Sequence, residues 1–233
     1  MSFWQNLYDG FYTNVVASNR WLLLLKGLGI TLEISLFAVI IGVVLGIVLA
    51  LAKISKSKNI IIAFFRWLSN AFIDVIRGTP SFVQLLIINF VVFASVDIDK
   101  TIVASIAFGL NSAAYIAEII RAGIQSINKG QTEAGRSLGL SEGLTMRYII
   151  LPQAIKNILP ALGNEFIVLV KETSVAGYIG AYELTKASQI ITSRTYNSFW
   201  PLLSIAVIYF VVVKLLSAAL TAFEKKLGKA DAR

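Results

Sequence analysis

The chain contains no cysteine and no histidine among its 233 residues. Their absence excludes disulfides, thiolate or imidazole metal ligands, and any hydrolytic triad that needs a histidine. Charged residues are also scarce, at 15% where about 25% is ordinary, whereas apolar residues reach 57% and the mean hydropathy is +0.76. The composition therefore indicates an integral membrane protein, and we expect no catalytic residue and no metal site in it.

The N-terminal segment lacks the pattern of a cleaved signal peptide. It reads MSFWQNLYDGFYTNVVASNR, which is aromatic and polar, whereas a signal peptide has a basic head, a short apolar core and a small-residue cleavage site. We expect residues 1–20 to form an extracytoplasmic segment at the membrane surface.

Five apolar runs are each long enough to cross about 30 Å of hydrocarbon, which takes roughly 20 helical residues. They are residues 21–52, 60–96, 101–120, 152–172 and 200–222. The second run is too long for one straight span and contains the sequence RGTP, Arg77 to Pro80. Because proline removes a backbone donor and clashes with the preceding turn, we expect a break at residues 78–80. The sequence thus predicts an all-α membrane domain, residues 21–222, with five transmembrane helices.

Basic residues are concentrated in three segments of the chain: Lys53, Lys56 and Lys58; Arg121, Lys129, Arg136 and Arg147; and Lys225, Lys226, Lys229 and Arg233. By the positive-inside rule these segments face the cytoplasm. Two crossings then separate each cluster from the next, which places the N-terminus outside and the tail, residues 223–233, in the cytoplasm. The net charge of +8 therefore reflects membrane orientation, and we expect no nucleic acid as a partner.

A polar segment, about residues 121–150, interrupts the apolar runs and includes the stretch EAGRSLGLSEGLTMRYIILPQA, residues 133–154. Gly130 and Gly139 flank a run that predicts a two-turn helix, with Glu133 near its positive end and Gly139 in the left-handed terminating position. So short a helix is marginal alone, so we expect it to be held against another surface. An ordinary solvated loop is the alternative.

Three motifs in this chain resemble those of the membrane subunits of bacterial ABC importers. The first follows the family's spacing E-A-A-x3-G-x9-I-x-L-P, with glycine in place of the second alanine, through Glu133, Ala134, Gly135, Gly139, Ile149, Leu151 and Pro152. The stretches IRGTPSFVQLL, residues 76–86, and LVKETSVAGYIG, residues 169–180, resemble segments of the polar amino-acid uptake permeases, which include histidine, arginine and glutamine permeases. The resemblance covers most of residues 20–222.

The resemblance implies a type I ABC importer permease fold in the bacterial inner membrane. It implies that the helix from Glu133 to Gly139, with Ala134, Gly135 and Arg136, is a coupling helix that docks on a separate ATPase. The implied partners are two ATPase subunits, a second permease subunit of the same or a sister kind, and an extracytoplasmic amino-acid-binding protein. The chain lacks a G-x-x-x-x-G-K-[ST] phosphate loop, so ATP and Mg²⁺ would be bound by the ATPase, and this transport subunit would carry no cofactor and no enzymatic activity.

Charged groups inside a span cost about 2.5–3.5 kcal/mol each on insertion scales, so they mark candidates for the solute path. Asn111, Tyr115 and Glu118 fall at i, i+4 and i+7 and form one polar face, which would contact either solute or a neighbouring helix. Arg77 could pair with Asp74 or with Glu118. The residues that we expect along the solute path are Asp74, Arg77, Asn111, Ser112, Tyr115, Glu118, Glu172, Thr173 and Ser174.

The charges within the spans favour a basic amino acid as the solute. Leaving aside long cations that can reach the membrane surface, five acids (Glu33, Asp74, Glu118, Glu165 and Glu172) face two bases (Arg77 and Lys171). A bound cation would relieve this negative excess. One alternative is a secondary amino-acid transporter driven by an ion gradient, which would normally show more spans and an internal repeat. The other, a membrane-embedded enzyme, would have to work with carboxylates alone.

Overall fold

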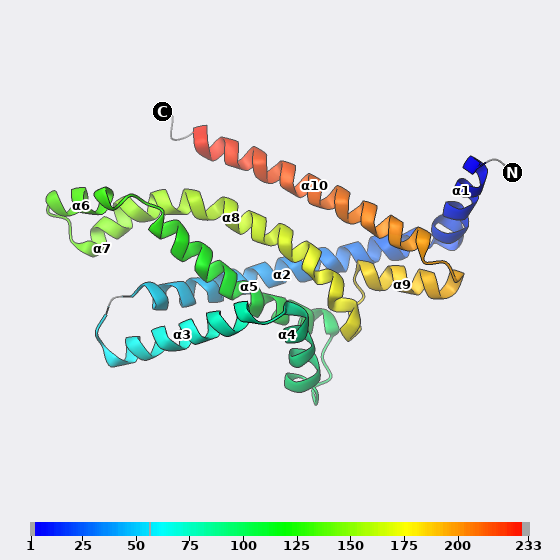
Figure 1. Cartoon of the computed structure of the whole chain (residues 1–233), viewed down its shortest axis with the longest axis horizontal. Helices are drawn as coiled ribbons and strands as arrows, with labels where there is room; N and C mark the ends of the chain where they lie inside the picture. The colour runs from blue at the N-terminus through cyan, green and yellow to red at the C-terminus, as the bar shows by residue number, and fades with distance from the viewer. Residues whose placement is uncertain (1–2, 56, 230–233) are drawn as a thin grey trace. The chain divides into compact units, whose positions relative to one another are not determined.

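The computed structural model describes residues 3–55 and 57–229, and every regular element in this part of the chain is a helix (Figure 1). The α-helices are α1 (Phe3–Phe11), α2 (Trp21–Ile54), α3 (Ile60–Gly78), α4 (Ser81–Ile87), α5 (Lys100–Gln125), α6 (Lys129–Ser137), α7 (Glu142–Thr145), α8 (Leu151–Glu172), α9 (Leu184–Thr195) and α10 (Phe199–Lys229). The predicted all-α fold is confirmed. Of the predicted tail, residues 223–229 continue α10, whereas residues 230–233 lie outside the described part, as does Lys56 of the first basic cluster.

Shorter helical segments of two other kinds connect these elements. Three are π-helical, at Tyr12–Val16, Ile88–Val92 and Met146–Ile150, and two are 3₁₀-helical, at Ala17–Asn19 and Thr173–Ile179. The predicted surface segment, residues 1–20, is therefore helical over most of its described length.

Among the described residues, α2, α5 and α10 are each long and apolar enough to cross a membrane. The helix α3 and the residues from Ser81 to Val92 pass the same test only together, as a pair with a sharp bend between them. Because α3 ends at Gly78 and α4 begins at Ser81, the predicted break is confirmed. The helix α8 is not among these candidates, since residues such as Lys156 and Glu165 lower its hydropathy. The crossing at residues 152–172 stays a prediction.

The described residues form two compact units, and α2, α5, α8 and α10 each contribute part of their length to both. The first unit comprises residues 3–38, 81–108 and 167–217. Its buried core contains Val15, Leu24, Leu184, Ala187, Ile191 and Ile205. In this unit α9 therefore packs on α2 and α10 through aliphatic side chains.

Glu183 fixes the start of α9 in the first unit. Its side chain is fully buried and accepts hydrogen bonds from the backbone N–H groups of Thr185 and Lys186, both at 2.6 Å, while the Tyr209 hydroxyl lies 3.4 Å away. Burial raises the pKa of Glu183 above its ordinary value. The carboxyl group supplies acceptors for two N–H groups that a helix N-terminus otherwise leaves unbonded.

The second unit comprises residues 39–55, 57–80, 109–166 and 218–229. Here α2 approaches α5 closely along a row of small residues, Gly42, Gly46 and Ala50. A Cβ atom added at Gly46 would lie 2.7 Å from Cγ2 of Ile116, and one at Gly42 would lie 3.0 Å from Cβ of Ser112. Small residues spaced four apart let two helix backbones approach closely inside a membrane.

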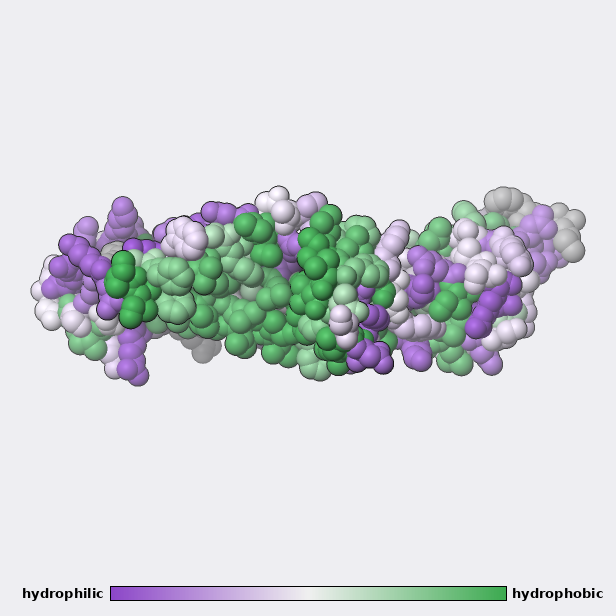
Figure 2. All heavy atoms as spheres, turned by 90° about the horizontal axis from the view of Figure 1, so that it is seen from below, coloured by the Kyte–Doolittle hydropathy of each residue, from purple (hydrophilic) through white to green (hydrophobic). Residues whose placement is uncertain are grey.

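The surface of the second unit separates into apolar and polar parts. Figure 2 shows hydrophobic residues on the side where α3 lies, and hydrophilic residues gathered at the end where α6 and α7 lie. On α3, Ile60, Ile61, Phe64 and Trp67 are each more than half exposed. A face this apolar suits contact with lipid or with another membrane helix.

Candidate coupling segment and solute path

The helix α6 has a side-chain cap at its N-terminus. The side-chain oxygen of Asn128 accepts a hydrogen bond from the Gly130 N–H at 2.8 Å, as a capping residue does. The helix begins at Lys129, two residues before the predicted start. Glu133 consequently lies in the second turn, so the expected position near the positive end of the helix is not observed.

Gly139 terminates α6 in the left-handed conformation, with φ of +81°. Its N–H donates to the Arg136 carbonyl at 3.0 Å, and the Leu140 N–H donates to the Gly135 carbonyl at 3.1 Å. These two bonds form a Schellman motif, in which the terminating residue needs a positive φ that glycine adopts without strain. The short helix ending at Gly139 is confirmed.

Gly135 is the point at which α6 contacts α7 and the π-helical segment after it. Gly135 is buried, whereas Glu133 and Ala134 are exposed. A Cβ atom at position 135 would lie 2.7 Å from Cγ2 and 2.9 Å from Oγ1 of Thr145, and 3.0 Å from Cδ1 of Ile149. The expected supporting surface is therefore the chain's own next turns, and the absence of a side chain permits the approach.

On its other side α6 presents side chains to solvent. Glu133, Ala134, Arg136 and Leu138 are all exposed, and Leu138 is 80% exposed. Leu138 is the C-cap residue of α6, so the exposed surface of this segment combines charged side chains with one apolar side chain.

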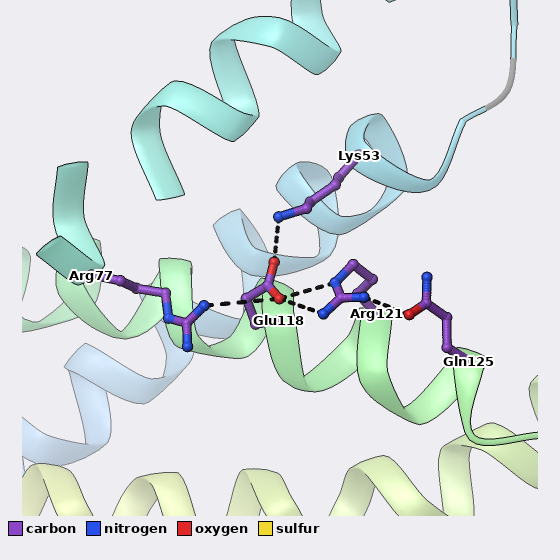
Figure 3. A network of polar contacts seen from close by, with 5 residues as sticks. All are labelled: Lys53, Arg77, Glu118, Arg121 and Gln125. Atoms are coloured by element: carbon purple, nitrogen blue, oxygen red, sulfur yellow. Dashed lines mark hydrogen bonds and ion pairs between the residues drawn. The ribbon is translucent and has the colours of Figure 1, made fainter. Parts of the chain in front are cut away.

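Glu118 lies at the centre of an ion-pair network in the second unit (Figure 3). Lys53 Nζ on α2 is 2.5 Å from Oε1. Arg121 on α5 donates from Nε and Nη2 to Oε2 at 2.9 and 2.8 Å and from Nη1 to Gln125. Arg77 Nη1 on α3 is 3.9 Å from Oε2, and Figure 3 shows it on the side of the carboxylate opposite Arg121. With Glu118 only 15% exposed, three cations share one largely buried carboxylate.

This network decides between the two pairings that the sequence left open for Arg77. Arg77 pairs with Glu118, and its guanidinium carbon lies 5.5 Å from the centroid of the Tyr115 ring, within range of a cation–π contact. Asp74 is exposed and takes part in no ion pair within the described part of the chain. Because the network uses Lys53 and Arg121, which the charge count had left out, the negative excess around Glu118 is offset.

Asn111 and Ser112 are both buried on α5. The Ser112 hydroxyl donates to Oε1 of Glu165 on α8 at 2.8 Å, so this part of the polar face joins two helices. Tyr115, in contrast, is 38% exposed. The predicted polar face therefore contains an interhelical hydrogen bond at Ser112 and a partly open side chain one turn later.

Glu172, Thr173 and Ser174 belong to the first unit. Thr173 is fully buried, and its hydroxyl donates to a backbone carbonyl at 3.0 Å. Ser174 lines a cavity of about 340 Å³ together with Lys171 and Tyr209. Of the nine residues expected along the solute path, six thus lie in the second unit and three in the first.

The sequence pattern did not indicate a network that includes Lys53, Arg121 and Gln125. The clustering of basic residues predicts cytoplasmic segments for the first two. The i, i+3 spacing of Glu118 and Arg121 was a usable signal. No local pattern could have paired Lys53 with Glu118, 65 residues away.

Comparison with known proteins places the chain in a family. Residues 42–229 match the family described as binding-protein-dependent transport system inner membrane component. The chain is 42% identical over 212 residues to a Rickettsia bellii protein provisionally named as a glutamine transport system permease, covering 90% of this chain and 95% of that protein. It is 42% identical over 210 residues to the arginine transport system permease protein ArtQ of Bacillus subtilis, covering 89% and 94%.

Solved structures agree with this assignment. A chain in a crystal structure of an amino acid ABC transporter with histidines is 47% identical, with a TM-score of 0.82 over 88% of this chain and 94% of that one. An inward-facing structure of the MetNI methionine ABC transporter, at 23% identity and a TM-score of 0.74 over 91% and 99%, shows the same fold. The chain therefore belongs to the family of inner membrane components of binding-protein-dependent transport systems, and it is a multi-pass permease subunit of an ABC transporter and not an enzyme.

Proposed function

We propose that this chain forms the translocation path of an ATP-driven importer for a polar amino acid. The observation that carries the proposal is the family match over residues 42–229, and the relatives named for arginine and glutamine transport support the solute class. Two ATPase subunits, a second permease subunit (a copy or a sister chain) and an extracytoplasmic binding protein complete the transporter. An ion-gradient-driven transporter is not favoured, because the matching family works with a binding protein.

In this proposal the chain crosses the inner membrane five times, with its N-terminus outside and its C-terminus in the cytoplasm. The crossings are α2, the bent pair α3–α4, α5, α8 and α10. The helix α8 has 22 residues, enough to cross about 30 Å of hydrocarbon, and its Glu165 bonds to Ser112. A polar helix of this kind is tolerated in a membrane when its polar side chains face other helices.

We further propose that α6 is the coupling helix that docks on the ATPase. Its capped ends and its contact with α7 through Gly135 support this role, because a helix that transmits force must not unwind. Glu133, Ala134, Arg136 and Leu138 would supply the docking surface.

The coupling role can be tested with two glycines of the same segment. Gly139 and Gly143 both have open space where a Cβ would lie, but only Gly139 has a positive φ. Gly139→Ala should destabilise the C-terminus of α6 by about 1–2 kcal/mol, because alanine is strained at a positive φ. It should therefore reduce solute-stimulated ATP hydrolysis and uptake in the assembled complex. Gly143→Ala should leave both near wild type. Equal activity of the two variants would remove α6 from the coupling route.

For the solute we propose a basic amino acid. Because Glu118 is shared by three cations, Asp74 is the acid of the second unit better placed to accept the solute's amino groups. Backbone groups at the break between α3 and α4, where residues 79 and 80 lie outside regular helix, would bind its carboxylate. Asp74→Asn should depress arginine uptake about tenfold, about 1.4 kcal/mol, and glutamine uptake less. Equal losses for both solutes would assign Asp74 a structural role instead.

A further inference from the structure

An open cavity of about 1000 Å³ lies in the second unit, where the ends of α2 and α5 meet α6, α7 and the π-helical segment. The solute path described above does not use it. Its lining contains three cations, Lys53, Arg121 and Lys129, and one acid, Glu142. The cavity therefore carries an excess of positive charge.

The excess persists after the ion pairs are counted. Lys53 and Arg121 pair with Glu118, and Glu142 is a second acid at the cavity. The three lining cations therefore face two acids, and one positive charge remains in excess. Lys129 is exposed and has no ion pair among the described residues. An anion entering the cavity would therefore meet a field that the protein's own acids do not cancel.

The cavity also lies at a boundary between apolar and polar parts of the chain. The apolar run of α2 ends just before Lys53 and that of α5 just before Arg121. Ile124 and Met146 line the same cavity, so apolar and cationic groups are both available. Figures 1 and 2 place α6 and α7 at the hydrophilic end of this unit.

We propose that this cavity binds an anionic phospholipid, with the headgroup phosphate at Lys53, Arg121 and Lys129 and the start of an acyl chain against Ile124. Basic pockets between transmembrane helices on the cytoplasmic side bind such headgroups. An amphiphilic lining matches a lipid better than a free anion, which has no apolar part. A lipid bound here would contact both the spans and α6, so the lipid composition of the membrane would affect the coupling segment. The site does not depend on which solute is carried.

The test is photo-crosslinking of the assembled permease–ATPase complex in nanodiscs. The discs contain a small fraction of phosphatidylglycerol with a photoreactive acyl chain, and labelled peptides are mapped by mass spectrometry. Peptides that contain Ile124 and Met146 should be labelled. Lys129→Gln should reduce this labelling about fivefold at subsaturating probe, since a basic residue near an anionic membrane surface contributes about 1 kcal/mol. The control is Lys225→Gln, an exposed cation of α10 outside the cavity, which should leave the labelling unchanged.

Four outcomes would overturn the proposal. Equal labelling by a photoreactive phosphatidylcholine would show that the headgroup is not recognised. Loss of labelling in excess inorganic phosphate would show that a free anion is the ligand. Labelling that appears only when the ATPase is absent would make the cavity a protein-docking surface, and an unchanged yield in Lys129→Gln would remove the cationic site.

Discussion

Replacing Gly135 with alanine, the residue that the related motif carries there, tests how α6 is held against its neighbours. In an isolated helix this change stabilises by about 0.5–1 kcal/mol, because alanine loses less backbone entropy than glycine. Here the added Cβ would lie 2.7 Å from Cγ2 of Thr145, and overpacking of this kind typically costs about 1–3 kcal/mol. We therefore expect a net destabilisation of about 1 kcal/mol.

The matched partner variant is Thr145→Ala. It removes both Thr145 atoms that the new Cβ would meet, and it also removes a buried hydroxyl with no hydrogen-bond partner among the described residues. In the Thr145→Ala background only Cδ1 of Ile149, the end of a flexible side chain, remains close to the new Cβ, at 3.0 Å. Gly135→Ala should then become stabilising by up to about 0.5–1 kcal/mol. The effect of Gly135→Ala on the stability of α6 thus changes sign between the two backgrounds. The difference between the two effects is the coupling energy of the pair, and its size is that expected for residues in contact.

Hydrogen–deuterium exchange of the α6 amides in the reconstituted complex measures these local free energies. Gly135→Ala alone should speed exchange about fivefold, which corresponds to about 1 kcal/mol, and the double variant should exchange more slowly than Thr145→Ala. If Gly135→Ala slows exchange in both backgrounds, α6 does not pack on Thr145 and the argument for a rigidly held coupling helix fails.

Three further predictions concern the ion-pair network, the helix contacts and the topology. Glu118→Gln leaves three cations without their carboxylate and should lower the free energy of unfolding by about 1–3 kcal/mol. The purified complex should then unfold at a lower temperature. An unchanged unfolding temperature would mean that the network does not contribute to stability. Gly46→Val should lower the stability of the protein by about 1–3 kcal/mol through overpacking. Gly29→Val is the control, because a Cβ there has open space, and it should leave the stability unchanged. Similar effects of the two variants would argue against the close contact of α2 and α5. A cysteine that replaces the exposed Leu144 should react with a membrane-impermeant reagent only from the cytoplasm. A cysteine that replaces the exposed Asp97 should react only from outside. Reaction at position 97 only from the cytoplasm would contradict five crossings.

Features encoded by neighbouring residues could be predicted from the sequence. Gly139 ends α6 because the Schellman turn needs a positive φ, and glycine at the end of a short polar run indicates this directly. The break between α3 and α4 follows in the same way from Gly78, Thr79 and Pro80, because proline cannot donate the next helical bond. In both cases the cause and its effect lie within four residues of each other.

Features that depend on tertiary contacts could not be predicted. The clustering of Lys53 with other lysines predicts a cytoplasmic segment, yet the structure also pairs Lys53 with Glu118 on another helix. From the sequence, Gly135 indicates only a helix less stable than one with alanine there. Its contact with Thr145 depends on how the chain folds back after Gly139. Hydropathy likewise indicates whether α8 is apolar, but it does not show that Glu165 has Ser112 as a partner.

The central claim is that this permease moves an amino acid at the expense of ATP hydrolysed by another subunit. The most direct measurement is uptake of radiolabelled arginine into proteoliposomes that contain the permease with its ATPase. Binding protein is present outside and ATP inside, and ionophores collapse all ion gradients. We predict uptake that requires ATP, is lost when the ATPase is omitted, and is reduced by Gly139→Ala. Uptake that continues without ATP and requires an ion gradient would contradict the account.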